Sequence, residues 1–216
     1  CQTAREPSLP RPTRHRRPRF SGGAKRDVIF KLPSDGKDLW IEGIEFGNAT
    51  YALDVDTRCA VSLRNCVAVA AIKSAVSKLV TSKVTAEGCI FRLENLTDLP
   101  SRGCAYEFAD KATIENAQLT ACVLVGNDLE LKGVTLTDCL LLGTASLSGG
   151  TRLLHVTVAG GLTVREDERN VAITDSIVGA LEIAPPRQPA PKGKKKEIAV
   201  TLKNVAFFAQ TKALPK

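Results

Sequence analysis

The sequence has few aromatic residues and no methionine: only 5% of its 216 residues are Phe, Trp or Tyr. A core with so few rings must be narrow and filled mainly by aliphatic side chains and cysteine. No run of about 20 apolar residues occurs, so no membrane-spanning helix is predicted. P-loop, GxSxG, HExxH and dinucleotide-binding motifs are also missing, which removes the enzyme classes that are easiest to recognise.

A short repeated pattern is the strongest positive signal. Two apolar residues lie four and two positions before a turn-forming residue, and a small residue usually follows it. The turn-forming residues are mostly Asn, Asp or Gly, which tolerate positive φ: Asn48, Asn65, Gly88, Ala121, Asp138, Gly160, Asp175 and Asn204. The alternation predicts a short strand with one inward face before each turn. The repeat therefore predicts a stack of coils that bend at equivalent corners.

The spacing of these corners fits a solenoid. Most successive corners are about 20 residues apart, as expected for one coil. Two steps are longer, and we assign their extra residues to inserted loops at about 95–106 and 184–196, because solenoids tolerate insertions at turns. A third strand per coil is visible where the apolar frame of residues 39–44 recurs at residues 129–134.

Three strands per coil with one tight Asn corner resemble the right-handed parallel β-helix of the pectate-lyase-like superfamily. The resemblance covers residues 38–208, is one of architecture, and comes with no catalytic motif. We expect an all-β fold, a single-stranded right-handed parallel β-helix of about eight coils over residues 27–208. An extended or disordered basic arm over 1–26 precedes it and a tail over 209–216 follows it. A left-handed hexapeptide helix and an immunoglobulin-like sandwich fit the repeat less well.

Positive charge is concentrated at the start of the chain. Residues 1–26 contain eight basic residues and one acid, which equals the net charge of +7 of the whole chain. Such an arm suits an anionic partner, with RNA or a nucleoprotein complex as one option and an acidic protein groove as another. A solubilising terminus or a transit-peptide remnant would look similar. The predicted anion-binding residues, including a basic cluster in the second loop, are Arg11, Arg14, Arg16, Arg17, Arg19, Lys25, Arg26, Lys192, Lys194, Lys195 and Lys196.

Seven cysteines are present, and four of them share the inward position just after a corner: Cys66, Cys89, Cys122 and Cys139. In-register side chains on parallel strands point the same way, which strains a disulfide. We therefore predict buried free thiols and a reducing intracellular compartment. A column of thiols is not tetrahedral, so neither a metal site nor a cofactor is predicted. As an alternative, Cys1 is the lipid-bearing residue of an envelope lipoprotein.

The best catalytic candidates are Asp54, Asp56 and Arg58 in the stretch ALDVDTR. Alternate residues on a strand share a face, so this spacing would gather two carboxylates and a cation. The resemblance implies a polysaccharide lyase or glycosidase as the matching activity. Asp is equally common in solvated turns, so the trio has a plain structural interpretation too.

The last predicted coil contains Phe207 and Phe208. A solenoid leaves an unpaired strand edge at each end, so we predict that these residues dock on another protein chain. The sequence as a whole predicts a non-enzymatic scaffold subunit of a larger assembly, held to an anionic partner by its arm. A carbohydrate-active β-helix and an envelope lipoprotein are the alternatives.

Overall fold

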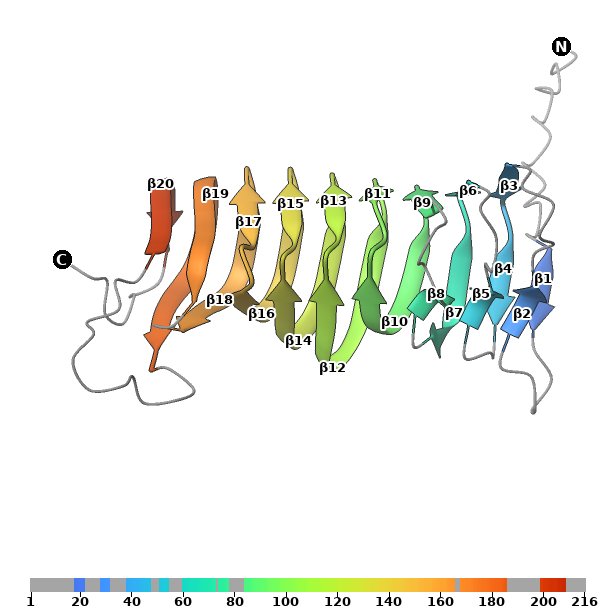
Figure 1. Ribbon diagram of the computed structural model, residues 1–216, viewed down its shortest axis with the longest axis horizontal. Coiled ribbons are helices and arrows are strands. Elements are labelled where there is room, and N and C mark those ends of the chain that lie inside the picture. Colours follow the sequence, from blue (N-terminus) through green and yellow to red (C-terminus); the bar gives the residue numbers. More distant parts are fainter. Residues whose placement is uncertain are drawn as a thin grey trace, which may run out of the picture.

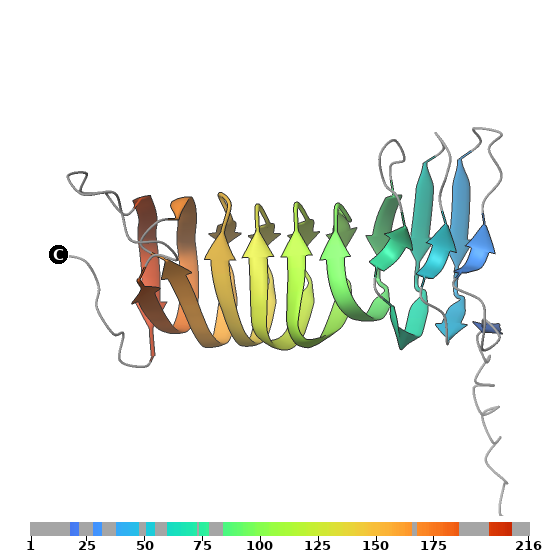
Figure 2. The same cartoon turned by 60° about the horizontal axis from the view of Figure 1, so that its bottom comes forward.

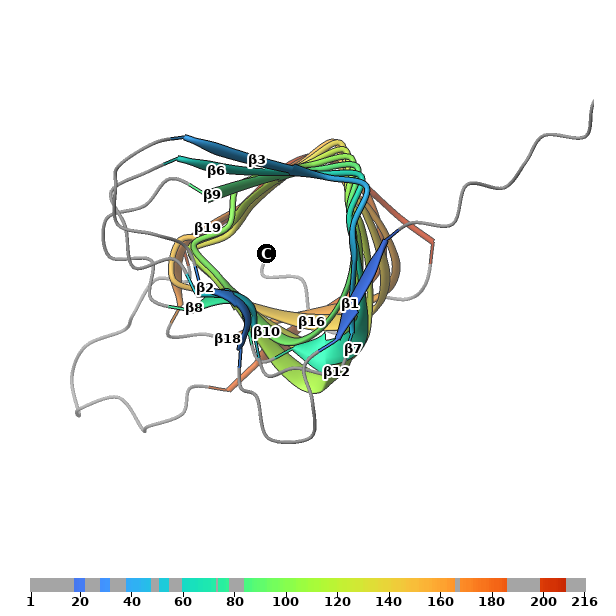
Figure 3. The ribbon, with the colours of Figure 1, turned by 90° about the vertical axis from the view of Figure 1, so that its right-hand side faces the viewer.

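The computed structural model describes residues 18–21, 28–31, 38–47, 51–54, 60–72, 74–77, 84–165, 168–185 and 199–208. All regular structure within these ranges is β-strand, and the strands pair in parallel (Figure 1). The coils stack into one elongated solenoid, which confirms the predicted all-β parallel β-helix. Viewed along its axis from the N-terminal end, the chain winds clockwise as it recedes, so the helix is right-handed (Figure 3). In the part of the chain that the structure describes, no helical segment has the length and apolar character needed to cross a bilayer.

Each coil contributes strands to three sides, which we call faces A, B and C (Figure 3). Face A consists of β3 (Leu39–Glu42), β6 (Val61–Arg64), β9 (Val84–Glu87), β11 (Ser101–Arg102), β13 (Gln118–Thr120), β15 (Thr135–Thr137), β17 (Arg152–Leu154) and the first parts of β19 (Arg169–Ala184) and β20 (Ala199–Phe207). Face B consists of β1 (Arg19–Ser21), β4 (Glu45–Gly47), β7 (Val67–Ile72), later parts of β19 and β20, and the first parts of β10 (Ile90–Thr97), β12 (Ala105–Glu115), β14 (Val123–Lys132), β16 (Leu140–Ser148) and β18 (Thr157–Arg165). Face C consists of the last parts of β10, β12, β14, β16 and β18 and of the last part of β19 that pairs with β18. A separate three-stranded sheet contains β2 (Val28–Lys31), β5 (Tyr51–Asp54) and β8 (Ser74–Ser77) (Figure 2).

The corner between faces A and B is a column of residues with φ between 48° and 69°: Gly43, Asn65, Gly88, Gly103, Ala121, Asp138, His155, Asp175 and Asn204. Backbone hydrogen bonds link successive corners. The N–H of Asn65, for example, donates to the carbonyl of Glu87 over 3.0 Å, and that of Asp138 to the carbonyl of Leu154 over 3.0 Å. Asn65, Asp138 and Asp175 therefore lie on a single edge of the winding, as predicted.

Three corners differ from the sequence-based assignment. Gly43, whose N–H donates to the Arg64 carbonyl over 3.0 Å, makes the corner that was assigned to Asn48, and Asn48 lies outside the described residues. His155 makes the corner that was assigned to Gly160. Gly103 makes a corner inside the predicted loop 95–106, so that prediction was wrong.

The missed coil at Gly103 has a physical reason. Its face A strand is only Ser101–Arg102, directly after Pro100, which has no backbone N–H to donate. Of the usual apolar pair before the corner only Leu99 is present, because Ser101 takes the second position. Pro100 and Gly103 also look like loop residues. In the structure the flanking strands β10 and β12 pair in register, so these residues complete an ordinary coil.

Gly160 belongs to a second column, where the chain turns from face B to face C: Gly126, Gly143, Gly160 and Gly179. A Cβ on Gly143 would lie 1.9 Å from the Gly126 carbonyl oxygen, and one on Gly160 would lie 1.9 Å from that of Gly143. At Gly143, Gly160 and Gly179 the neighbouring backbone leaves no room for a side chain, whereas the nearest atoms at Gly126 belong to the Leu129 and Phe108 side chains. Close approach of neighbouring coils alone requires glycine at Gly160 and Gly179, and at Gly143 a φ of 127° adds to it. At Gly43 and Gly103 glycine accommodates a positive φ.

The predicted arm 1–26 also needs a correction. Residues Arg19–Ser21 form β1, which pairs in parallel with β4, so the solenoid begins before residue 27. Of the arm, only residues 18–21 are described, and the tail 209–216 lies outside the described residues. The second predicted loop starts at the end of β19, and its residues 186–196 are likewise outside them.

The core is a continuous column of inward side chains, mostly Val, Leu, Ile and Cys. Its aromatic part is a short stack in which the Phe91, Tyr106 and Phe108 rings lie 5.4 and 5.7 Å apart, centroid to centroid. The Tyr106 hydroxyl is buried and hydrogen-bonds to the Ser101 hydroxyl, which satisfies both polar groups. Burial raises the pKa of Tyr106 well above its usual value, so the phenol stays neutral.

Candidate functional site

The last described strand, β20, leaves the core open at one end. Its inward residues continue the rows of β19, since Leu202 pairs with Ile173 and Phe207 with Val178. Ile173 and Val178 are 0% exposed, whereas Leu202 is 36% exposed because no further described strand covers it. Among the described strands β20 pairs only with β19, so its outer edge still has hydrogen-bonding groups to offer.

Both residues that were predicted to dock on a partner lie at this open end. Phe207 is partly buried and packs against the core, while Phe208 is 61% exposed. The N–H of Phe208 donates to the Val178 carbonyl over 3.3 Å, which fixes the backbone there. The structure brings the two rings to one end of the solenoid, and docking itself stays a prediction.

Of the predicted anion-binding residues, Arg19 alone lies in the described ranges. Its Nε is 3.2 Å from Oε1 of Glu45 on the neighbouring strand, so this guanidinium already faces a carboxylate. The others lie outside the described residues: Arg11, Arg14, Arg16, Arg17, Lys25, Arg26, Lys192, Lys194, Lys195 and Lys196.

The predicted catalytic trio is placed only in part. Asp54 is the last residue of β5, where its backbone pairs with Lys31 of β2 and Ser77 of β8. Asp56 and Arg58 lie outside the described residues, so the trio stays a prediction.

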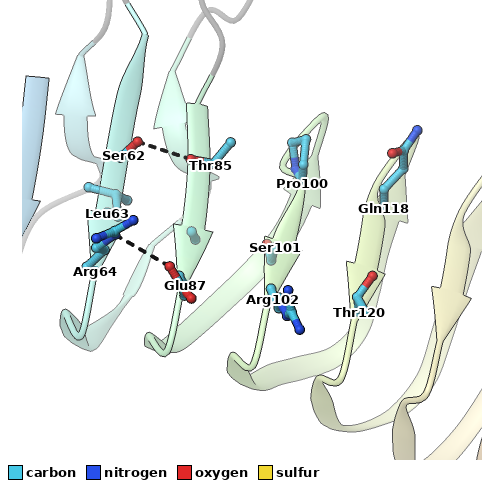
Figure 4. A pocket seen from close by; sticks show the side chains of 11 residues that line it. Ser62, Leu63, Arg64, Thr85, Glu87, Pro100, Ser101, Arg102, Gln118 and Thr120 are labelled. Atoms are coloured by element: carbon cyan, nitrogen blue, oxygen red, sulfur yellow. Dashed lines mark hydrogen bonds and ion pairs between the residues drawn. The ribbon is translucent and has the colours of Figure 1, made fainter. Parts of the chain in front are cut away.

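A groove that the sequence did not reveal crosses face A from β6 to β13 (Figure 4). Its volume is about 360 Å³, and its polar lining consists of Ser62, Arg64, Thr85, Glu87, Ser101, Arg102, Gln118 and Thr120. The hollow lies where β11 shrinks to two residues after Pro100, so the missed coil also explains the missed groove.

The two arginines of this groove differ in their surroundings. The Arg64 Nε lies 3.4 Å from Oε2 of Glu87, and its guanidinium carbon lies 4.8 Å from the centroid of the Trp40 ring. Within the described part of the chain, the Arg102 guanidinium makes no ion pair, and the side chain is exposed. Arg102 is therefore the group best able to receive a carboxylate or another anion. A second hollow of about 450 Å³ beside the corner is lined by Glu42, Arg64, Glu87 and Arg102, whose charges alternate in sign.

A column of five thiols lies just inside the corner, each at most 3% exposed: Cys66, Cys89, Cys104, Cys122 and Cys139. Cys104 is the addition to the predicted set, since it follows the missed corner Gly103. Each thiol donates to a carbonyl two residues earlier, as Cys139 does to Thr137 over 3.2 Å. Donation requires the protonated thiol, which is also the form that burial favours.

Neighbouring thiols affect one another through hydrogen bonds. Contact with Cys104 and then Cys66 raises the pKa of Cys89, and contact with Cys122 raises that of Cys139, with burial adding to both. The same kind of contact lowers the pKa of Cys66, next to Cys89, and of Cys122, next to Cys104. The thiols are thus close enough for each to influence the pKa of its neighbours.

A comparison along the column shows what this position requires. Ser176 takes the thiol's place two coils after Cys139: its Oγ donates to the Thr174 carbonyl over 2.7 Å and accepts the Val156 N–H over 3.0 Å. Cys139 likewise accepts the Cys122 N–H over 3.4 Å. Val156 occupies the same position in the coil between them and is buried, so the position accepts either a small hydrogen-bonding side chain or an apolar one. This pattern makes the column part of the core packing. The described residues contain no group of three or more His, Cys, Asp or Glu side chains arranged to hold a metal ion.

Comparison with protein-family models, with curated proteins and with solved structures found no match to this chain. The fold is a parallel β-solenoid, and an architecture of this kind carries many unrelated functions. Any function must therefore be argued from the surfaces of this solenoid.

Proposed function

We propose that this protein is a structural subunit of a larger assembly, a rigid β-helical rod whose β20 end docks on another protein chain. The open core at β20 is the observation that supports this proposal: Leu202 is 36% exposed although its register partner Ile173 is fully buried. An apolar row beside a free strand edge is stabilised when another strand completes it.

The chemistry of β20 defines the partner. It is a polypeptide that adds a parallel strand, with apolar side chains at alternate positions to cover Leu202, Val205 and Phe207. Phe208, exposed beside this row, supplies a ring that the partner covers from the side. Such a strand reproduces what the next coil of the solenoid would provide.

The basic arm gives the assembly a second, electrostatic contact. Residues 1–26 carry the net charge of the whole chain, +7, and suit an anionic partner such as RNA or an acidic protein surface. Contacts to a polyanion weaken steeply as salt rises, so binding that persists at high salt would rule out this part of the proposal. The five free, buried thiols agree with a reducing compartment.

The docking proposal is tested by purifying the tagged chain from its native source. Phe208→Glu should lose at least one protein that the wild type retains, because the charge lies beside the apolar row. Lys203→Glu is the matched control, since Lys203 lies on the same strand and is exposed. Identical sets of retained proteins for the wild type and Phe208→Glu would contradict docking through this end.

A second candidate function is favoured by the groove on face A, where Arg102 is exposed beside hydroxyl and amide side chains and beside the ion pair of Arg64 and Glu87. In this alternative the protein is a pectate-lyase-like enzyme that acts on an acidic polysaccharide, with Asp54, Asp56 and Arg58 as its catalytic group. Depolymerisation of such a polysaccharide, abolished by Asp56→Ala and weakened by Arg102→Ala, would replace the scaffold proposal. No turnover with either variant or the wild type would remove this candidate.

A further inference from the structure

The outer surface of face B is apolar along much of the solenoid. Ile90, Val125, Leu142 and Ile177 are 50%, 40%, 39% and 49% exposed, and Val123 and Leu140 are partly exposed between them. These side chains point away from the core, so the fold does not require them to be apolar. Contiguous exposed apolar side chains on a protein surface mark an interaction site.

The strand register arranges these residues in two parallel rows. The first row runs Ile90, Ala105, Val123, Leu140, Thr157, Ile177. The second row, two residues further along each strand, includes Arg92, Glu107, Val125 and Leu142. Five register steps separate Ile90 from Ile177, and at ~4.8 Å per step they span about 24 Å.

The rows are self-complementary. Their midpoint lies between the strand with Val123 and Val125 and the strand with Leu140 and Leu142. A two-fold axis through this midpoint, parallel to the strands, places Ile90 against Ile177 of a second copy. The same axis places Val125 against Leu142, and small Ala105 against Thr157, so large side chains meet at the ends and the centre. Such a surface can pair with itself, as an isologous interface must.

The charges on face B allow the same contact. Arg92 and Glu107 lie 2.7 Å apart, Nε to Oε2, and neutralise each other, as do Arg19 and Glu45 at 3.2 Å. In the two-fold arrangement the pair of Arg92 and Glu107 faces the first part of β18 of the second copy, near Ala159, where side chains are small. The charges that this contact covers are then paired, so association pays for desolvating an ion pair but leaves no isolated charge buried.

We propose that two copies of this chain associate through the outer surfaces of face B, with their solenoid axes antiparallel. The contact uses a different surface from the β20 end and does not depend on docking there. The paired area is a few hundred Å² per copy, below the roughly 800 Å² of a standard stable interface. The dimer is therefore weak and forms as the protein concentration rises.

Sedimentation equilibrium of the full chain tests the association between about 5 and about 500 μM protein. The weight-average mass should rise from 23.1 kDa towards twice that value as concentration increases. Val125→Asp puts a charge at the centre of each copy and should keep the mass at that of one chain. Thr85→Asp, an exposed outward position on face A, should behave as the wild type. A wild type that stays monomeric throughout, or a Val125→Asp variant that dimerises equally, overturns the proposal.

A cross-linking experiment tests the geometry. Ile90→Cys and Ile177→Cys variants are mixed and treated with a short bismaleimide. Both variants also carry Cys1→Ser and Cys59→Ser, and the five thiols of the core are buried. The antiparallel arrangement should then give one dominant linked pair that joins residue 90 of one copy to residue 177 of the other. Parallel side-by-side association would instead link like positions in each variant alone, and end-to-end stacking would link neither. If Val125→Asp does not fold, Leu142→Gln takes its place, since Leu142 occupies the facing position.

Discussion

Faces A and B differ on the outside although they are alike on the inside. Leu136 on face A and Leu141 on face B are both 0% exposed, and both sit in register within continuous apolar rows. Their outward neighbours differ: face A presents mostly polar residues such as Thr137, with Trp40 and Leu154 as exceptions, while face B presents Leu142, which is 39% exposed. Inward positions are constrained by packing between coils, so they specify the fold. Outward positions are free of that constraint, so they carry the information about partners.

The largest loss of stability is expected at the turn from face B to face C, where the backbones of neighbouring coils approach most closely. Gly160→Ala places a Cβ 1.9 Å from the Gly143 carbonyl oxygen, and backbone cannot move aside as a side chain can. We expect a loss of at least ~3 kcal/mol in the free energy of unfolding, or no folded protein. Gly161→Ala is the control, because the nearest atom to its Cβ would be 4.0 Å away. Equal stability of the two variants in urea denaturation would argue against the close stacking of these coils.

Shortening inward side chains should destabilise faces A and B to a similar degree, because both faces pack into the same core. Leu136→Ala and Leu141→Ala each remove a fully buried side chain and should each cost about 2–5 kcal/mol. The outward Leu142→Ala should cost less than ~1 kcal/mol, because Leu142 is partly solvated already. Chemical denaturation of the three variants gives the ranking. A Leu142→Ala variant as unstable as the inward ones would mean that face B is covered within the monomer.

The inside of the solenoid is also the part that the sequence could predict. Apolar alternation before Asn65, Asp138 and Asp175 is a local signal, and it led directly to the fold and the corner edge. The coil at Gly103 was not predicted because its face A strand is only two residues long. For the same reason the sequence did not predict the place of Cys104 in the thiol column or the groove on face A. Gly160 was wrongly predicted as a corner because a glycine can be required either by a positive φ or by a close backbone approach. Only the structure shows that close approach is the reason at Gly160.

The candidate surfaces were less predictable than the fold. The exposed end at Phe207 and Phe208 followed from the position of the last coil. The apolar outer row of face B did not, because a residue such as Leu142 can be assigned inward or outward only when its register is known. Outward rows combine residues from many coils, so they lack a local sequence signal.

Transplanting the outer pattern tests whether outward residues alone decide association. Thr120 and Thr137 are in register on face A, so Thr120→Val with Thr137→Leu copies the Val125 and Leu142 pair of face B. The free energy of unfolding should change by less than ~1 kcal/mol, since both positions are at the surface. Sedimentation should show stronger association than in the wild type. The reverse pair, Val125→Thr with Leu142→Thr, should weaken association. If neither pair of substitutions changes the sedimentation behaviour, association does not depend on the outward residues of these faces.

The smallest effect is expected at His155, where faces A and B meet. His155 adopts a φ of 53°, which costs a His side chain more than an Asn, because the short Asn amide can hydrogen-bond locally. Its Nδ1 lies 3.3 Å from Oδ1 of Asp138 and its Nε2 lies 3.8 Å from Oδ2 of Asp175. His155→Asn keeps a donor for one of these carboxylates, much as the Asn204 amide donates to Asp175 over 2.7 Å. Thermal unfolding should show a gain of up to ~0.5 kcal/mol, whereas His155→Val, a β-branched residue that resists positive φ, should lose ~1 kcal/mol or more. A destabilised His155→Asn variant would show that the two contacts to carboxylates outweigh the backbone preference at this corner.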